Sequence, residues 1–390
     1  MRITYTAPNR SHHYPYAEAL NRAGYLHAFV SGFSRFSPRS PLPSIGNKLK
    51  RHDFFQNLYL ACLKFNTPTP ITDTVNNLSN FTLDRVSYRL AKESDVFIYY
   101  RTEGYNSSLR LRKGGYTTLR VLEEVNTHVD VCTALMQEEY DRIGLGKYRE
   151  KFADHALRLK AYEEADCILC PSEFVRRSFL LKGFSPNQLI KVNFGFPSIE
   201  VIPFNVEQPE KETFRLLYVG QLNYRKGLRY AIEAFRRLKH PKKKFIIVGP
   251  KTAITGLEKT KIPDEVIFIG SLKGEALKEQ YRRASIFVLP SIEEGLALVQ
   301  GEALASGVPL LITTNTGGED LITDGREGFI VPPGNVEILL ERLQQMADDK
   351  DLLLKMSKAA LQTAKDIGSW DIAANCLITQ LKSKLNTVNF

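Results

Sequence analysis

Two glutamates separated by seven residues stand out among the side chains whose type and spacing could do chemistry. Glu294 and Glu302 flank a stretch that follows an apolar segment and turns helical near Leu298, which sets the two carboxylates along one helix. Carboxylates accept hydrogen bonds from vicinal hydroxyls, and a helix N-terminus between them suits a phosphate. An ordinary surface position is a credible alternative for Glu293. It is a poor one for Glu302, because an unpaired carboxylate in an otherwise apolar helix is costly.

A basic turn is the second candidate for chemistry. An apolar segment ends at Gly220, and Arg225 and Lys226 follow in a short loop, with a helix predicted to begin near Lys226. Backbone N–H groups at a helix N-terminus, together with two cations, suit a phosphate or diphosphate. A solvated basic turn between a strand and a helix is an equally good interpretation of this segment taken alone.

Alternating apolar strands and amphipathic helices must position these residues, and they fall into two halves. This alternation predicts an α/β fold of two Rossmann-like domains with parallel sheets that face a central cleft. The predicted strands are 2–6, 25–30, 95–100, 118–125, 166–171 and 189–194, then 214–220, 244–248, 266–269, 286–289 and 309–313. Residues 198–213 are predicted to be a linker, and three helices close the chain at about 335–347, 351–366 and 370–388.

The composition is typical of an ordinary globular protein of two or three domains, with 390 residues, of which 43% are hydrophobic and 25% charged. No run of about 18 uncharged apolar residues occurs, and the first residues are typical of a strand and not of a signal peptide. We therefore expect a cytoplasmic protein. Cys167 and Cys170 form a C-x-x-C, but they fall in a predicted buried strand, which favours a structural role over a redox one.

The positive charge is uneven along the chain. The net charge is +10, and residues 1–51 hold eight Lys/Arg against one acidic residue, Glu18. Such a surface attracts anionic lipid, nucleic acid or anionic sugars, but no nucleic-acid reading module is recognised, so we expect no nucleic-acid partner. Residues 45–65 lead from basic residues into an apolar, aromatic helix. Peripheral contact with the inner face of an anionic membrane is one interpretation; packing of this stripe on the first domain is the favoured one.

Taken together, these motifs resemble family 4 of the retaining glycosyltransferases. The pair Glu294 and Glu302 looks like the family's E-x7-E motif, and 302–309, 219–227 and 317–334 resemble the stretches around it. The resemblance implies the GT-B fold. Its domains would be an acceptor-binding Rossmann-like domain at 1–200, a nucleotide-sugar-binding one at 201–369, and a helix at 370–390 that packs back on the first domain.

The resemblance also implies roles for matching positions. Lys226, with Arg225 beside it, would neutralise the donor diphosphate, Glu294 would bind hydroxyls of the transferred sugar, and Glu302 would bind the ribose. His128 resembles the family's histidine near the reacting carbon, although a lone histidine is more often structural. The expected catalytic residues are thus His128, Glu294, Lys226 and Arg225. The expected donor-binding residues are Gly220, Gln221, Arg225, Lys226, Glu294, Gly295, Leu296, Ala297, Leu298 and Glu302.

Two departures from the family pattern concern the phosphate and acceptor sides. Gln221 stands where family members often carry arginine, so that Arg225 has to replace that charge. The glycine-rich loop expected after the first strand is replaced by a segment that contains Asn9, Arg10, His12 and His13. These four residues are candidates for contacting the acceptor, and a rigid local turn is an equal alternative.

The resemblance implies that the chain is an enzyme that moves a hexosyl group from a nucleotide-diphosphate sugar to an acceptor. A UDP-sugar is the expected donor; a saccharide, a lipid or a small molecule is the expected acceptor, as in polysaccharide or glycolipid biosynthesis. Transfer would retain the anomeric configuration and need neither metal nor cofactor, since cationic side chains stabilise the leaving diphosphate. The alternatives are a catalytically silent sugar-nucleotide-binding or scaffold protein and a sugar-nucleotide 2-epimerase.

Overall fold

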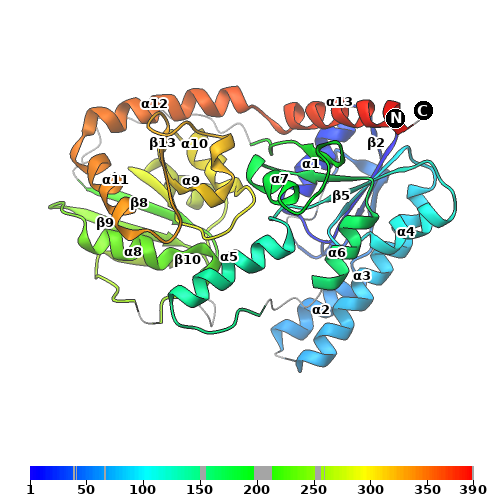
Figure 1. Cartoon of the computed structure of the whole chain (residues 1–390), viewed down its shortest axis with the longest axis horizontal. Helices are drawn as coiled ribbons and strands as arrows, with labels where there is room; N and C mark the ends of the chain where they lie inside the picture. Colours follow the sequence, from blue (N-terminus) through cyan, green and yellow to red (C-terminus); the bar gives the residue numbers. More distant parts are fainter. Residues whose placement is uncertain are drawn as a thin grey trace.

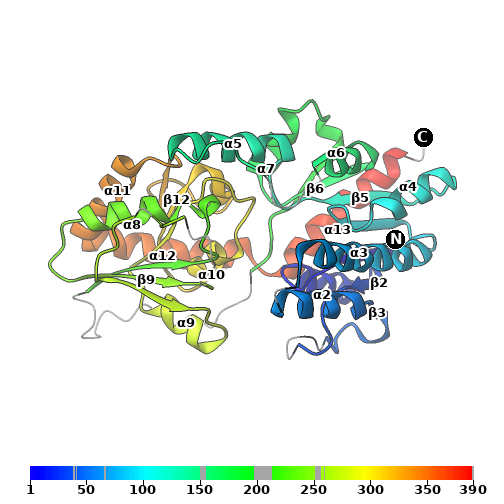
Figure 2. The ribbon, with the colours of Figure 1, turned by 90° about the horizontal axis from the view of Figure 1, so that it is seen from below.

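Two parallel sheets with helices packed on them make up the protein, one from each half of the chain (Figures 1 and 2). The computed structural model describes residues 1–37, 40, 42–65, 67–149, 155–196, 213–250, 256–258 and 260–388. The predicted linker at 198–213, apart from its last residue, and the predicted boundary between residues 200 and 201 lie outside these ranges. No helix within the described ranges is long and apolar enough to cross a membrane.

The first sheet has seven parallel strands in the order β3-β2-β1-β4-β5-β6-β7. Every residue of β1 and of β5 is buried, as expected for strands covered on both faces. The strands are β1 Ile3–Ala7, β2 Leu26–Ser31, β3 Leu49–Arg51, β4 Val96–Tyr100, β5 Leu119–Glu123, β6 Cys167–Cys170 and β7 Leu189–Lys191. The helices are α1 His13–Arg22, α2 Phe54–Lys64, α3 Thr69–Ala91, α4 Tyr105–Lys113, α5 Val129–Arg142, α6 His155–Glu164 and α7 Glu173–Leu180.

The second sheet has six parallel strands in the order β10-β9-β8-β11-β12-β13. The strands are β8 Phe214–Val219, β9 Lys243–Val248, β10 Val266–Gly270, β11 Ile286–Leu289, β12 Leu310–Thr313 and β13 Gly328–Val331. The helices are α8 Leu228–Arg237, α9 Glu275–Arg282, α10 Leu298–Ala305, α11 Val336–Asp348 and α12 Lys350–Ile367. In each sheet the order of successive strands changes direction beside the strand that comes first in the chain, β1 or β8. Such a switch point is where open α/β sheets bind ligands.

The last helix, α13 (Trp370–Val388), returns from the second domain to the first. It follows α12 after a break at Gly368, and in Figure 1 the two helices run along one side of the molecule across both domains. Helix α13 packs on α1. The indole of Trp370 contacts the rings of Tyr16 and Phe194, and Arg22 pairs with Asp371. The chain therefore crosses between the domains twice.

The predicted α/β class with two parallel sheets is confirmed, and each predicted strand and closing helix has a counterpart. Two short strands were missed. Strand β3 has only three residues, two of them charged, and β13 is only four residues long and directly follows a turn at 325–327. The helix expected near Lys226 begins instead at Leu228, because residues 224–226 form a 3₁₀ turn that ends at Gly227.

Candidate donor site between the two domains

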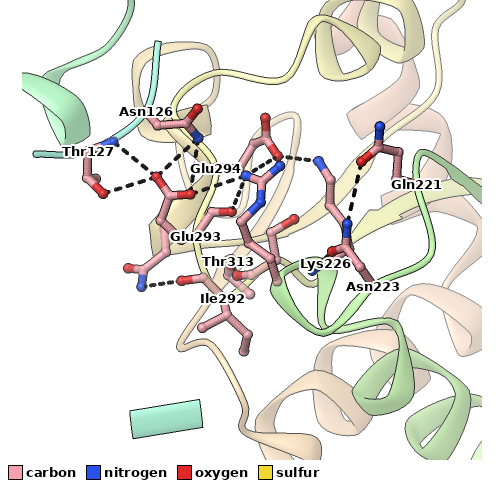
Figure 3. A network of polar contacts seen from close by, with 12 residues as sticks. Asn126, Thr127, Gln221, Asn223, Lys226, Ile292, Glu293, Glu294 and Thr313 are labelled. Atoms are coloured by element: carbon pink, nitrogen blue, oxygen red, sulfur yellow. Dashed lines mark hydrogen bonds and ion pairs between the residues drawn. The ribbon is translucent and has the colours of Figure 1, made fainter. Parts of the chain in front are cut away.

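The carboxyl ends of three strands of the second sheet meet a loop of the first domain at one place. The loop after β8 carries the 3₁₀ turn Tyr224–Lys226, the loop after β11 carries Glu293 and Glu294, and the loop after β12 carries Asn315. Strands β8 and β11 are neighbours at the switch point of the second sheet. The first domain contributes Asn126 and Thr127 from the loop after β5 (Figure 3).

Local sequence explains why the β8 and β11 loops fit together. Asn223 caps the 3₁₀ turn by accepting a hydrogen bond from the Lys226 N–H at 3.2 Å. Gly227 then adopts φ +59°, and a Cβ there would lie 2.1 Å from the carbonyl oxygen of Pro290, so only glycine fits. The Ile292 N–H donates to the Arg225 carbonyl at 2.8 Å, which fixes the two loops to each other.

Two cations and two carboxylates face one another in this space. The Lys226 ammonium donates to Glu294 Oε2, and Arg225 Nη1 lies 3.0 Å from the same oxygen. Arg225 Nη1 also lies 3.2 Å from Glu293 Oε2 and 2.9 Å from the Glu293 carbonyl. The predicted donor residues Arg225, Lys226 and Glu294 are therefore brought together, as Figure 3 shows for the labelled Lys226 and Glu294.

Glu293 joins the two domains. Its side chain is fully buried and accepts from the Asn126 side-chain amide at 3.1 Å and from the Thr127 N–H and hydroxyl at 3.0 Å each. Since Arg225 holds the same carboxylate from the second domain, Glu293 has donors from both sides. The interpretation of Glu293 as an ordinary surface residue is therefore wrong. A buried carboxylate needs such donors; Arg225 lies 68 residues away in the chain, and the donors from the first domain lie 166 or 167 residues away.

The charges set the ionisation of the site. Burial raises the pKa of Glu294, but Lys226 and Arg225 outweigh burial and hold that pKa at about 2. Burial also lowers the pKa of Arg225, yet Glu294 and Glu293 more than reverse this, so the pKa stays above its ordinary value. Glu294 is therefore an anion and Arg225 a cation throughout the ordinary pH range.

Glu302 lies apart from these charges, on α10. Its carboxylate accepts one hydrogen bond from the Tyr281 hydroxyl of α9 at 2.9 Å. Burial raises the pKa of Glu302, and the bond from Tyr281 opposes this only in part. Among the described residues no cation is paired with Glu302, so its remaining lone pairs can accept other donors.

The remaining predicted donor residues line the start of α10 and the end of β8. Leu296 and Ala297 are buried, and Ala297 precedes α10, whose first N–H groups have no acceptor within the helix. Gly295 lies at the domain boundary, because a Cβ there would sit 1.7 Å from the Val125 carbonyl oxygen. The Gln221 side chain is exposed and accepts a long 3.5 Å contact from Asn223, its backbone carbonyl accepts the Tyr218 hydroxyl at 2.6 Å, and Gly220 directly follows β8.

The predicted acceptor residues separate into two groups. Asn9 is exposed, and the Arg10 guanidinium lies over the Tyr14 ring at 4.9 Å. His12 and His13 are buried instead, at 2.9 Å and 3.3 Å from the two oxygens of Glu123 at the end of β5. This arrangement is a buried network that follows β1.

The histidine–glutamate network also includes a tyrosine. The Tyr5 hydroxyl lies 2.7 Å from Glu123 and 2.6 Å from His13 Nδ1, and the His12 ring stacks on Phe194 at 4.5 Å. Burial, with His12 nearby, lowers the pKa of His13 to about 4. Burial raises the pKa of Glu123, but the two histidines more than offset it and leave the pKa well below its ordinary value. The network thus holds an ionised carboxylate inside the first domain.

His128 caps α5, and its ring lies within the first domain. Nδ1 accepts from the Asp130 N–H at 3.2 Å, and the ring packs against Tyr162, Phe179 and Phe184 at 5.0–5.9 Å. Burial lowers the pKa of His128 to about 4, although Asp130 opposes this. These contacts favour the structural interpretation of His128, while the adjacent Asn126 and Thr127 face the second domain.

Several residues of the site were missed in the sequence. Asn126 and Thr127 directly precede His128, and Asn315 accepts the Glu294 N–H on its carbonyl oxygen at 2.8 Å. Tyr281 lies on the mostly polar helix α9 and Glu123 is the last residue of β5. The only signal was position, since Glu123, Asn126 and Asn315 stand at or just after the ends of strands.

An Asp-x-Asp triplet at 349–351 is exposed and lies at the start of α12. Asp349 accepts a hydrogen bond from the Leu352 N–H at 2.9 Å.

The second domain is similar in sequence to a known protein family. Residues 200–363 match the family model described as "Glycosyl transferases group 1". Among curated proteins, the chain is 29% identical over 211 residues to "Sulfoquinovosyl transferase SQD2" of Arabidopsis thaliana, covering 51% of this chain and 41% of that protein. It is 33% identical over 179 residues to a Mycobacterium tuberculosis glycogen synthase, covering 44% and 43%. The chain thus spans less than half the length of these two relatives.

Solved structures resemble the whole chain at low identity. Sucrose-phosphate synthase from Thermosynechococcus elongatus superimposes with a TM-score of 0.68 at 18% identity, over 99% of this chain and 100% of that one. Anabaena HepE in complex with UDP and glucose gives 0.67 at 14% identity, over 98% and 100%. These likenesses establish the GT-B fold, and the family match shows that residues 200–363 are similar to the group 1 glycosyl transferases.

Proposed function

We propose that this chain is a retaining glycosyltransferase that moves a sugar from a nucleotide-diphosphate donor, a UDP-sugar, to a saccharide, lipid or small-molecule acceptor. The observation that carries the proposal is the cluster of Arg225 and Lys226 against Glu294 at the switch point of the second sheet. The resemblance to Anabaena HepE, a protein solved with UDP and glucose, supports the choice of UDP.

The donor diphosphate would bind the two cations. Lys226 and Arg225 both contact Glu294, so an entering diphosphate takes over these cations as partners and leaves the Glu294 carboxylate to accept hydroxyls of the sugar. Lys226 is nine-tenths buried, and a cation in so little water stabilises an anion strongly. Glu302, supported by Tyr281, would accept the ribose hydroxyls.

The chemical step needs no protonated acid, because a nucleoside diphosphate is a good leaving group. As the bond between the anomeric carbon and the diphosphate oxygen breaks, negative charge builds on the phosphates. Lys226, Arg225 and the first N–H groups of α10 would stabilise that charge. The acceptor hydroxyl would bond to the same face of the sugar, so the configuration is retained, and its proton would pass to the leaving diphosphate. The proposed step needs no metal, because the two cations would supply the positive charge that a metal would otherwise bring.

The first domain would hold the acceptor and close over the donor. Its loop after β5 already bonds to Glu293, the neighbour of Glu294, so the two domains meet directly beside the proposed sugar. Exclusion of water there would limit hydrolysis of the donor.

Proton NMR of the product of the full chain with an α-linked UDP-sugar tests this proposal. We expect a new glycoside with α configuration, and a loss of at least about a hundredfold in kcat/KM in Lys226→Ala. Lys244→Ala, an exposed lysine at the amino end of β9, is the matched control. A β-linked product would contradict retention. Conversion of the sugar nucleotide to its C2 epimer would favour the epimerase alternative. Tight binding of the donor without turnover would favour the catalytically silent binding protein.

A further inference from the structure

The helical hairpin of α2 and α3 carries an unusual number of exposed apolar side chains. Of fifteen large hydrophobic residues exposed in the described part of the chain, eight lie between residues 54 and 81. Each of the eight is 41–76% exposed. They are Phe54, Leu58, Leu60, Leu63 and Phe65 at α2, and Ile71, Leu78 and Phe81 on α3. The sequence favoured packing of the 45–65 stripe on the first domain, and for these α2 residues that interpretation is wrong.

These side chains are exposed because of the way the hairpin packs on the first domain. Helix α3 packs against β1, β2 and α4, whereas α2 packs chiefly on α3, and Figure 1 shows the hairpin projecting from the first domain. Only Cys62 of α2 is buried. Phe54, Leu58 and Phe65 are four and seven residues apart, which places them on one face of α2. Soluble surfaces rarely gather apolar side chains in this way unless something covers them.

The exposed charged residues of the hairpin indicate which kind of partner it binds. Lys50, Lys64, Arg85 and Arg89 are exposed, and Lys64 lies 5.9 Å from the Phe65 ring centre. Two of the three acids between residues 48 and 92 are buried and hydrogen-bonded within the protein. Asp53 is held by Arg35, with Nη2 at 2.6 Å from its carboxylate.

Asp84 is the second buried acid. It accepts the N–H groups of Asn106 and Ser107 at the start of α4, at 3.0 Å and 2.8 Å. It lines a hollow of about 420 Å³ together with Phe81, Arg85 and Arg110. Only Asp73 therefore remains as an exposed acid on the hairpin.

We propose that the α2–α3 hairpin is a docking surface for an anionic lipid bilayer. The apolar side chains of α2 enter the boundary between headgroups and acyl chains, and the exposed Lys and Arg residues meet the negative headgroups. This combination of apolar face and basic flanks fits a bilayer better than a protein partner, which would need complementary shape. The inference is independent of the sugar transfer proposed above.

Flotation of the full chain with vesicles tests the proposal. We expect binding to phosphatidylcholine vesicles that contain phosphatidylglycerol, weaker binding to phosphatidylcholine alone, and weakening by salt. The variant Phe54→Ser/Leu58→Ser/Phe65→Ser should lower partition at least about tenfold. Its control is Phe36→Ser/Leu181→Ser, two exposed apolar residues elsewhere, which should bind like the parent. Lys64→Glu/Arg85→Glu should lose the preference for anionic vesicles.

Three outcomes would overturn the proposal. They are absence of binding to anionic vesicles at low salt, equal loss in the triple variant and its control, and a dimer in sedimentation that the triple variant dissociates. The last would show that a second copy covers the hairpin. Circular dichroism of each variant establishes that it is folded, and donor binding is expected to stay unchanged, so failure here leaves the transferase proposal untouched.

Discussion

Glu293 and Glu294 are neighbours in the chain but hold different partners. Glu294 faces Lys226 and Arg225 within the second domain, whereas Glu293 receives Asn126 and Thr127 from the first. The strand before them ends at Leu289, and the irregular loop after it lets successive side chains serve different purposes. Arg225 touches both carboxylates and so couples the proposed donor position to the domain boundary.

The buried position of Glu293 predicts a large effect of a small change. In Glu293→Gln an amide group faces donors from Asn126, Thr127 or Arg225, and the charge that balances Arg225 is lost. We expect a loss of about 2–4 kcal/mol in the free energy of unfolding, measured by urea denaturation. Glu319→Gln is the control, because Glu319 makes an exposed ion pair with Arg177 across the same boundary; it should cost less than about 1 kcal/mol. An equal loss of unfolding free energy in the two variants would show that the Glu293 contacts between the domains are no stronger than an exposed ion pair.

The pKa of Glu302 predicts a pH dependence of donor binding. Burial raises this pKa above its ordinary value, so Glu302 takes up a proton at a higher pH than an exposed glutamate does. The carboxylate is the better acceptor for ribose hydroxyls, so affinity should be full above the raised pKa and fall as pH decreases through it. Titration calorimetry with a UDP-sugar measures this; UDP is avoided because its terminal phosphate titrates nearby.

Glu302→Gln is the matched test of that assignment. The glutamine side chain does not titrate, so the variant should bind about tenfold more weakly at neutral pH and its affinity should change less as the pH falls. A profile as steep as that of the parent would mean that another group titrates.

At the scale of elements, the Gly295 loop is fixed between the two domains. Its carbonyl accepts from the Ser172 hydroxyl at 2.6 Å, and a Cβ on Gly295 would lie 1.7 Å from the Val125 carbonyl. Gly295→Ala therefore has to push the loop after β11 away from the end of β5. We expect loss of transfer activity and a larger radius of gyration by small-angle X-ray scattering. Ser172→Ala, which removes one hydrogen bond without adding an atom, should change both far less; unchanged scattering in Gly295→Ala would contradict this reading.

The sequence predicted most elements but less of the site. Long apolar runs such as β8 and β11 and the amphipathic helices at the C-terminus have strong local signals, whereas β3 and β13 are short and depend on pairing with a neighbour. Arg225, Lys226 and Glu294 were predicted from a basic turn, from the spacing of two glutamates and from the family resemblance, and the structure brings them together; their roles stay predictions. The roles of Glu293 and Tyr281 could not be foreseen, because their partners are 21 to 167 residues away and only the fold brings them together. The assigned roles of His128, His12 and His13 stay predictions, and burial now favours structural roles.

At the scale of the whole molecule, α13 ties the second domain to the first. Leu377 and Leu381 of this helix are fully buried, and Trp370 sits against Gly195, where a Cβ would lie 2.4 Å from the tryptophan backbone. Such a tether allows a hinge but keeps the two sheets together, which a site built from both domains requires.

Leu377→Ala measures the strength of this tether. Removal of a fully buried leucine side chain should cost about 2–4 kcal/mol in the free energy of unfolding. Ile372→Ala, on the same helix but 55% exposed, should cost about 0.5 kcal/mol or less. Differential scanning calorimetry of the full chain gives both values. Indistinguishable transitions in the two variants would mean that packing of α13 on the first domain does not contribute to stability.

Donor binding by the full chain tests the central claim most directly. Thermal-shift and saturation-transfer NMR measurements with UDP-, GDP- and ADP-sugars compare the parent with Lys226→Ala, Glu302→Ala and the control Lys244→Ala. The account predicts that a UDP-sugar stabilises the parent and Lys244→Ala, and that stabilisation is lost in the other two variants. If no sugar nucleotide stabilises the parent, or if Lys226→Ala and Glu302→Ala bind it as well as the parent does, the donor site is not where these residues meet.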